Sequence, residues 1–456
     1  VPKALFRLAF PTVIGQIILV VYNMADIFFV GLSGNDAMMT AVTVCMPAFM
    51  FLSAISNLFG IGGASVISRA LGRGKTGKVR AAAALAFWGC LITTLIYSVL
   101  AYTCRDLFID LLGGTDKAVH ENAVEYLMCT VAAGGSVTSV GMLLSHLIRA
   151  EGRAVYASSG IALGGVLNII LDPVFMFRIL PPGREALGAA VATTLANLIS
   201  LAYYVIVFIV IRGETKLSLR PCRAMLEKRL PAEIAGAGLP ACIMTLFENI
   251  SYAVLDKLMS LSGVAMQAGL GVAKKINMLA HCSVRGIAQG ALPLIGYTFA
   301  AGRFGRMRET VKTARMAAVG AAGLCMIVDL FLARELMGIF IHNDSSSLLS
   351  GMVFLRILCV GGPLSASAYT TISFFQATGE GKKSFFLAIL RKGVVDIPLM
   401  FLLNGLIPVY GIVIATPLAD ALCCLEAHRM LHRYIRKLPE EDRERRCAGT
   451  GPASAV

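Results

Sequence analysis

The sequence predicts an all-α integral membrane protein with twelve transmembrane helices in two similar halves. Three observations predict this fold. Across 456 residues, 57% are hydrophobic and only 15% are charged, whereas an average soluble protein has about 25% charged residues. Apolar segments of the length that crosses a bilayer, about 20 residues, recur along the chain. The first half of the sequence also repeats in the second, as in many transporters.

The clearest spans are 81–103 and 188–211, which contain no charged residue. Both are long enough to cross the hydrocarbon core as helices. The same reading, applied in order along the chain, predicts twelve spans near 4–31, 37–67, 79–104, 119–148, 154–179, 187–211, 231–259, 264–300, 307–333, 347–378, 383–404 and 409–436.

The first span follows Lys3 and Arg7 directly, without a small-residue cleavage site. It is therefore expected to be a membrane helix and not a signal peptide. Most of the 41 Lys and Arg residues lie at the N-terminus, in the links after even-numbered spans and after the last span. By the positive-inside rule both termini are expected in the cytoplasm, for a multi-pass protein of the inner (plasma) membrane of the cell. The net charge of +14 then needs no nucleic acid as a partner.

The chain divides into two lobes and two polar segments. Residues 1–211 are expected to form an N-lobe with helices 1 to 6, and 231–436 a C-lobe with helices 7 to 12. The basic segment 212–230 between them is predicted to be a cytoplasmic linker. The tail 437–456 is polar and rich in Gly, Ala and Ser near its end, which predicts disorder.

An internal duplication relates the two lobes at an offset of half the chain. Three pairs of segments show it: 74–80 with 302–308, 165–168 with 393–396, and 188–197 with 411–420. Each half has an even number of spans, so both copies insert with the same orientation. A pseudo-two-fold axis along the membrane normal is therefore predicted, as in the parallel-repeat transporters, and two such bundles can rock around a shared cleft.

Several local patterns occur in order along the chain: Pro11 with YNMADIFFVG at 22–31, the Gly/Arg-rich link 72–80, AEGR at 150–153, NIILDP at 168–173 and GAAVAT at 188–193. Together they resemble the MATE family, the multidrug and toxic compound extrusion transporters, over essentially the whole chain. The resemblance implies Na⁺- or H⁺-coupled antiport of mostly cationic amphipathic compounds. It also implies no cofactor beyond the coupling ion, small organic cations and the lipid bilayer as partners, and a monomer.

The first half carries few ionisable residues at membrane depth, where each costs about 2.5 to 3.5 kcal/mol. Asp26 is about 33 Å along its helix from the inner side and Asp172 about 27 Å, while Thr193 is about 9 Å from the outer side. All three are predicted to reach the same layer in the outer half of the bilayer.

Asn168 and Asp172 are spaced i, i+4 and therefore share a helix face. Together with Asp26 and Thr193 they offer only oxygen ligands, which suit Na⁺ or a shared proton equally. Alternatively, Asp172 before Pro173 caps a broken helix and Thr193 bonds its own backbone. In the MATE family the matching residues form the coupling-cation site, so the resemblance implies this role for Asp26, Asn168, Asp172 and Thr193.

The second half is more heavily charged. Glu248 matches an acidic residue of helix 7 that some MATE branches use, which implies a substrate or secondary cation site; Tyr22 and Asn23 beside Asp26 are assigned to the same role. Lys392 and Asp396 are spaced i, i+4 and are predicted to form an ion pair. The sequence departs from the family near Ser367, where those branches carry an acid in helix 10. The N-lobe is therefore favoured for coupling.

Other functional classes have weaker support. An enzyme or an ATP-driven pump is not expected, because the chain has no HExxH, GxSxG or Walker motif. A channel is disfavoured because the acids differ between the halves. His281 is expected to be a core histidine and not a proton relay. The alternative that stays open is a flippase for lipid-linked precursors, or an exporter of an endogenous metabolite, in the same superfamily.

Overall fold

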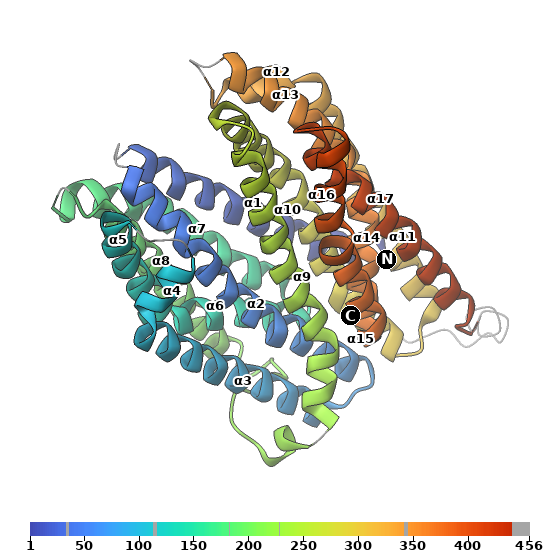
Figure 1. The fold of residues 1–456 in the computed structure, drawn as a ribbon. Coiled ribbons are helices and arrows are strands. Elements are labelled where there is room, and N and C mark those ends of the chain that lie inside the picture. The colour runs from blue at the N-terminus through green and yellow to red at the C-terminus, as the bar shows by residue number, and fades with distance from the viewer. Residues whose placement is uncertain (33–35, 113–115, 182, 228, 342–344, 440–456) are drawn as a thin grey trace.

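A computed structural model describes residues 1–32, 36–112, 116–181, 183–227, 229–341 and 345–439. Within these ranges the chain is helical and has no β-strand (Figure 1). Helices cover all twelve predicted spans, which confirms the predicted fold class. Of the predicted tail 437–456, residues 440–456 lie outside the described part of the chain.

The described residues of the first half form eight α-helices and two π-helical turns. In order they are α1 (Pro2–Leu32), α2 (Asp36–Gly72), α3 (Thr76–Thr103), α4 (Arg105–Leu111), α5 (Lys117–Leu127), η1 (Met128–Ala133), α6 (Gly135–Ala150), α7 (Ala154–Val174), η2 (Phe175–Ile179) and α8 (Glu185–Val210).

The second half repeats this plan after a short 3₁₀ helix, η3 (Arg223–Leu226), in the linker. Its elements are α9 (Arg229–Ser260), α10 (Val264–Ala300), α11 (Phe304–Phe331), α12 (Ala333–Gly338), α13 (Ser345–Val360), α14 (Gly362–Thr378), α15 (Gly381–Ile389), η4 (Leu390–Val394), α16 (Asp396–Leu406) and α17 (Tyr410–Arg436).

Two predicted spans are bent at a glycine. The chain turns by 48° around Gly134, between Lys117–Ala133 and α6, and by 41° around Gly361, between α13 and α14. The two bends occupy corresponding places in the two halves. By length and composition eight described helices could cross a membrane, and counting each bent pair as one span gives ten. These ten do not include α10 and the α15–α16 segment, which carry several of the basic residues of the C-lobe.

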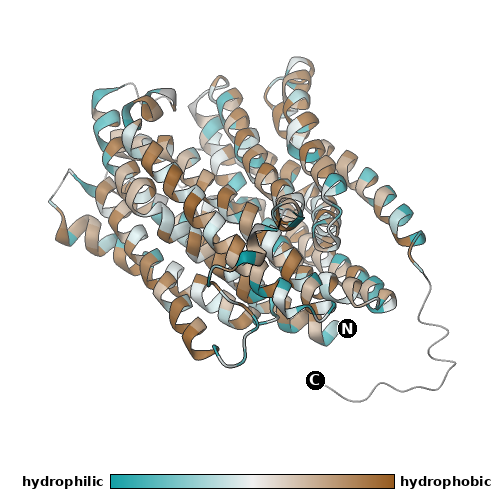
Figure 2. Ribbon diagram, turned by 90° about the horizontal axis from the view of Figure 1, so that it is seen from below, coloured by the Kyte–Doolittle hydropathy of each residue, from teal (hydrophilic) through white to brown (hydrophobic). Residues whose placement is uncertain are grey.

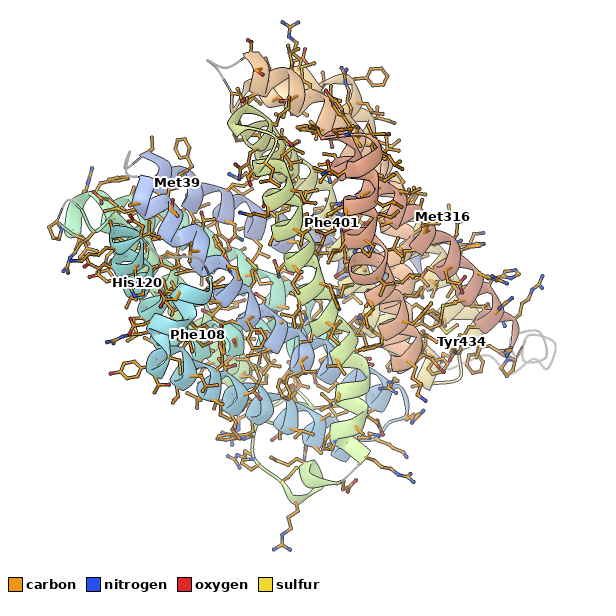
Figure 3. The ribbon with its side chains drawn as sticks, in the orientation of Figure 1. Met39, Phe108, His120, Met316, Phe401 and Tyr434 are labelled. Carbon is orange, nitrogen blue, oxygen red and sulfur yellow. The ribbon has the colours of Figure 1, made fainter. Side chains whose placement is uncertain are left out.

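The outside of the bundle is apolar, as a lipid-facing surface requires. Figure 2 shows hydrophobic residues, in brown, along the long helices. Large apolar side chains such as Val210, Phe331 and Leu425 are at least 70% exposed. Met316 and Phe401, labelled in Figure 3, are also exposed. Water would disfavour this much exposed apolar surface, so the surface is consistent with a protein that lies in lipid.

The lobes meet along a seam built from glycines of α2, α9 and α10. A Cβ atom on Gly62 would collide with the backbone oxygen of Ile234, and one on Gly238 with that of Leu58. Gly72 likewise faces the backbone oxygen of Tyr297. In Figure 1, α2 runs beside α9 in the lower part of the view, whereas the two groups of helices diverge toward the top. The seam therefore lies in the half of the bundle that carries the basic links 72–80 and 302–308.

Candidate functional site

Three helices of the N-lobe bring together the four residues predicted to bind a cation. The Nδ2 atom of Asn168 on α7 donates to Asp172 Oδ1, one helical turn away, and to Thr193 Oγ1 on α8, both at 3.1 Å. The side chain of Asp26 on α1 interacts with Asp172 and Asn168. All four are at least 92% buried, and Asp172 is fully buried.

The oxygens of this cluster are short of hydrogen-bond donors. Asp26 Oδ1, Asn168 Oδ1 and Asp172 Oδ2 are buried and have no hydrogen-bond partner in the described structure. Neither carboxylate forms an ion pair with a described Lys, Arg or His residue. Two neighbouring carboxylates repel each other when both are charged, so the group favours a bound cation or a shared proton. All the atoms that the cluster offers to a cation are oxygens, the ligand type of hard cations.

A cavity of about 50 Å³ adjoins the cluster between α1, α6, α7 and α8. Asn168 and Thr193 line it, together with Tyr22, Thr138 and Asn197. The sequence did not predict that Thr138 and Asn197 lie at this site. In the structure Asn197 Nδ2 donates to Thr138 Oγ1 at 3.0 Å. A signal for Asn197 was present in the repeat, where it corresponds to Asp420.

Of the two residues beside Asp26, only Tyr22 lies at this cavity. It is 8% exposed and interacts electrostatically with Asp26. Asn23 donates from Nδ2 to the backbone oxygen of Leu19, at 2.7 Å, within its own helix. The structure therefore places Tyr22 next to the cluster. The side-chain amide of Asn23 forms its described hydrogen bond within α1.

In the C-lobe, Glu248 on α9 is buried and forms an ion pair with Arg285 on α10. Spacing along the chain could not predict this pairing, because the two residues come from different helices. Glu248 also interacts electrostatically with His281, Arg391 and Lys392. Its surroundings are therefore basic, unlike those of Asp26. The position at which some branches carry an acid in helix 10 is held here by Ser367, which is half-buried on α14.

Two other buried acids of the C-lobe, Asp396 and Asp420, each have a basic partner, whereas the buried Asp329 on α11 forms no ion pair in the described structure. Lys392 Nζ is 3.0 Å from Asp396 Oδ2, which confirms the ion pair predicted from their spacing. Asp396 also accepts from Ser251 at 2.6 Å and from Thr416 at 3.1 Å. Arg391, the residue before Lys392, donates from Nε to Asp420 Oδ1 at 2.8 Å and from Nη2 to Ser365 Oγ at 2.5 Å. These contacts form a buried network whose charges cancel.

The comparisons with known proteins agree with this architecture. A profile of the MatE family matches residues 11–174 and 240–402, one match in each lobe. The chain is 28% identical to the multidrug export protein MepA of Staphylococcus saprophyticus over 433 residues, which cover 95% of this chain and 93% of that protein. It is 26% identical to MepA of Staphylococcus aureus over 435 residues, with the same coverage.

Solved structures show the same fold. A multidrug resistance MATE family transporter of the MOP superfamily, in an outward-facing conformation, matches with a TM-score of 0.87 at 23% identity over 96% of both chains. A MOP superfamily transporter from Pyrococcus furiosus, described as having a binding pocket of reverse polarity, matches with a TM-score of 0.85 at 24% identity, again over 96% of both chains.

Proposed function

The chain belongs to the MatE family of membrane transporters, and from this premise we propose that it is a cation-coupled antiporter that exports drugs or other toxic compounds. The relatives named as multidrug export proteins support the efflux activity. We assign no enzymatic reaction to it. The proposed substrates are small organic cations of amphipathic character, and the protein acts as a monomer in the lipid bilayer.

One observation carries the coupling mechanism: Asp26 and Asp172 are buried together without a basic partner among the described residues. A carboxylate pair in this condition exchanges Na⁺ or H⁺ readily, because a cation relieves both the repulsion and the cost of burial. Asn168 fixes the geometry by donating to Asp172 and Thr193. The coupling ion is cargo of the cycle, and no other cofactor is proposed.

Transport follows from the arrangement of the lobes. They touch along the glycine seam and diverge beyond it (Figure 1). In the proposed cycle the compound enters when the seam opens toward the basic links and leaves when the seam is closed. Cation binding in the N-lobe favours the state from which the compound is released. Cation and substrate are then linked, and each changes the affinity of the other by the same factor.

The proposed orientation places both termini and the linker 212–230 in the cytoplasm of the cell, with the protein in the plasma membrane. A single cysteine at Arg220 in a Cys-depleted variant should resist an impermeant thiol reagent added to intact cells. A cysteine at Leu180, between η2 and α8, should react with it. Labelling of the cysteine at position 220 from outside would show that the orientation is the opposite of the proposed one.

Two measurements test the proposal. Cells that express the protein should accumulate less of a cationic dye than cells with the Asp172→Asn variant at equal expression. In purified protein, substrate affinity is titrated with Na⁺ at fixed pH and with pH in the absence of Na⁺, which identifies the coupling ion. Wild-type cells that accumulate as much dye as cells without the protein would instead favour the lipid-precursor flippase or the metabolite exporter.

A further inference from the structure

Arg149 is a buried cation that has no acidic partner in the described part of the chain. It lies in the last turn of α6 and is only 2% exposed. None of the ion pairs in the described structure includes it, and the titratable groups that interact with it are Tyr204 and His146. Arginine stays protonated in proteins, so this guanidinium is charged. The C-terminal carbonyls of α6 offset that charge only in part.

The acids nearest in sequence and across the seam are engaged elsewhere. Glu151, two residues further on, accepts from Thr215 Oγ1 at 2.7 Å and from the backbone nitrogen of Lys216 at 2.6 Å. Glu233 accepts from Lys78 at 2.7 Å. By contrast Arg69, another arginine at the seam, interacts electrostatically with Glu233. Neither arginine forms an ion pair in the described structure, but Glu233 acts electrostatically on Arg69, whereas no carboxylate acts on Arg149 in this way.

Arg149 and the side chains that contact it have hydrogen-bond donors that are not used. Arg149 Nη1 is 3.3 Å from His146 Nδ1 and 3.3 Å from Gln289 Oε1. Since arginine can only donate, His146 Nδ1 accepts and the ring carries its proton on Nε2. Gln289 accepts through its oxygen, so its amide nitrogen is the end left to donate. Arg149 Nε is buried without any partner in the described structure.

These donors surround a small cavity that spans the two lobes. His146 and Arg149 of α6, Ile61 and Ala64 of α2, and Gln289, Leu292 and Pro293 of α10 line it. Its volume, about 10 Å³, has room for one water-sized species. A water molecule would satisfy one or two N–H groups, but it would not neutralise the guanidinium.

We propose that the cavity between His146, Arg149 and Gln289 binds a small monovalent anion such as chloride. The anion supplies the missing counter-charge and accepts from the unused N–H groups. Because α2 and α6 belong to the N-lobe and α10 to the C-lobe, the complete site exists only while the seam is closed. Anion binding therefore stabilises the closed seam, and opening the seam releases the anion.

The experiment uses the full-length protein in lipid nanodiscs, in buffers that differ only in chloride or gluconate. Amide hydrogen exchange of peptides covering 58–72 and 286–300 reports opening of the seam. In the wild type we expect exchange to be at least about fivefold slower in chloride, the lower end of usual coupling factors. Chloride-35 NMR lines should also broaden when the wild-type protein is added.

Two variants and one control make the test specific. Arg149→Gln should lose both the chloride effect on exchange and the line broadening. Gln289→Glu places a carboxylate beside Arg149 in place of the anion, so exchange should be slow in both buffers and the broadening should disappear. Arg69→Gln, at the same seam but with Glu233 near it, should keep the chloride response.

Equal exchange of the wild type in chloride and gluconate would overturn the proposal, as would a full chloride response in Arg149→Gln. If Arg149→Gln does not fold, Gln289→Glu decides the question, because a chloride response equal to that of the wild type contradicts the site. Neither readout involves the exported compound or the coupling cation. A failure here is therefore distinguishable from a failure of the proposed antiport.

Discussion

In the N-lobe, Asn168 donates to Asp172 and Thr193, whereas in the C-lobe the corresponding Asp396 accepts from Lys392 and Thr416. The repeat aligns Asn168 with Asp396 and Thr193 with Thr416. It also aligns Lys392 with Gly164, which lines the N-lobe cavity. The C-lobe thus places a lysine side chain at the position where the N-lobe has a glycine that lines the cavity with Asn168 and Thr193.

The two acids of the N-lobe cluster have no acidic counterpart in the C-lobe. The positions equivalent to Asp26 and Asp172 are Leu255 and Met400, both almost fully buried in an apolar core. A bilayer protein can offset a buried carboxylate with a fixed ammonium or with an exchangeable cation. Lys392 provides the first for Asp396, and we propose the second for Asp26 and Asp172. A fixed ammonium cannot leave during a transport cycle. The comparison therefore predicts that coupling depends on the N-lobe and stability on the C-lobe network.

The largest effect is expected for Asp172→Asn. The amide keeps the shape of the side chain but removes the charge that a cation needs. Uphill efflux should stop, and the influence of the cation on substrate affinity, commonly a factor of about 5 to 150, should vanish. Dye accumulation at matched expression measures the first, and substrate titration of purified protein the second. Undiminished efflux would place the coupling site outside this cluster.

The next effect concerns stability. Lys392→Met leaves Asp396 buried without a counter-charge, which should lower the free energy of unfolding by about 3 to 5 kcal/mol. Adding Asp396→Asn should restore most of this loss, because the pair is removed together. Thermal unfolding in one detergent compares the two variants. A single variant as stable as the double one would mean that Lys392 is not the counter-charge of Asp396.

Glu248 and Arg285 test how far the C-lobe contributes to binding. Glu248→Gln should weaken the binding of cationic substrates by about 1 to 3 kcal/mol, the range for hydrogen bonds to charged groups, while the cation linkage survives. Arg285→Gln frees the carboxylate and should shift affinity in the opposite direction. Equilibrium binding of a fluorescent organic cation to purified protein measures both. Loss of the linkage in Glu248→Gln would move the coupling site to the C-lobe.

The smallest effects separate two threonines at equivalent positions. Thr193→Ala removes a proposed cation ligand and should reduce cation affinity by about 0.5 to 1.5 kcal/mol. Thr416→Ala removes a donor to Asp396 and should lower the free energy of unfolding by a similar amount, with cation affinity unchanged. Cation titration and thermal unfolding of both variants form a matched set. The same response in both variants would mean that the lobes do not differ in this way.

Much of this arrangement could be predicted because it depends on spacing within one helix. The spans follow from apolar length, and the contact between Asn168 and Asp172 and the pair Lys392–Asp396 follow from i, i+4 spacing. Contacts between helices were harder to foresee. The Glu248–Arg285 pair depends on how α9 and α10 rotate against each other, which hydropathy does not determine.

The hydrogen-bond partners of single polar side chains could not be predicted from the sequence either. Asn23 lies beside Asp26 in the chain, yet its amide bonds to the carbonyl of Leu19. Arg149 is part of no recognisable motif. That it is buried without a carboxylate depends on how α10 packs against α6, which the sequence does not show. Both cases concern the direction of a side chain, which depends on neighbours that are distant in sequence or on the backbone of the same helix.

The glycine seam has a consequence for how the balance between conformations is adjusted. At Gly62 and Gly238 the facing backbones touch, so a single added methyl group would hold the lobes apart. Small substitutions along this line would therefore act as a rheostat, with each one raising the population of the separated form without altering any ligand-binding group. Variation between related transporters could tune the fraction of time spent in each state in this way, while the chemistry of the cargo and of the ion stays the same.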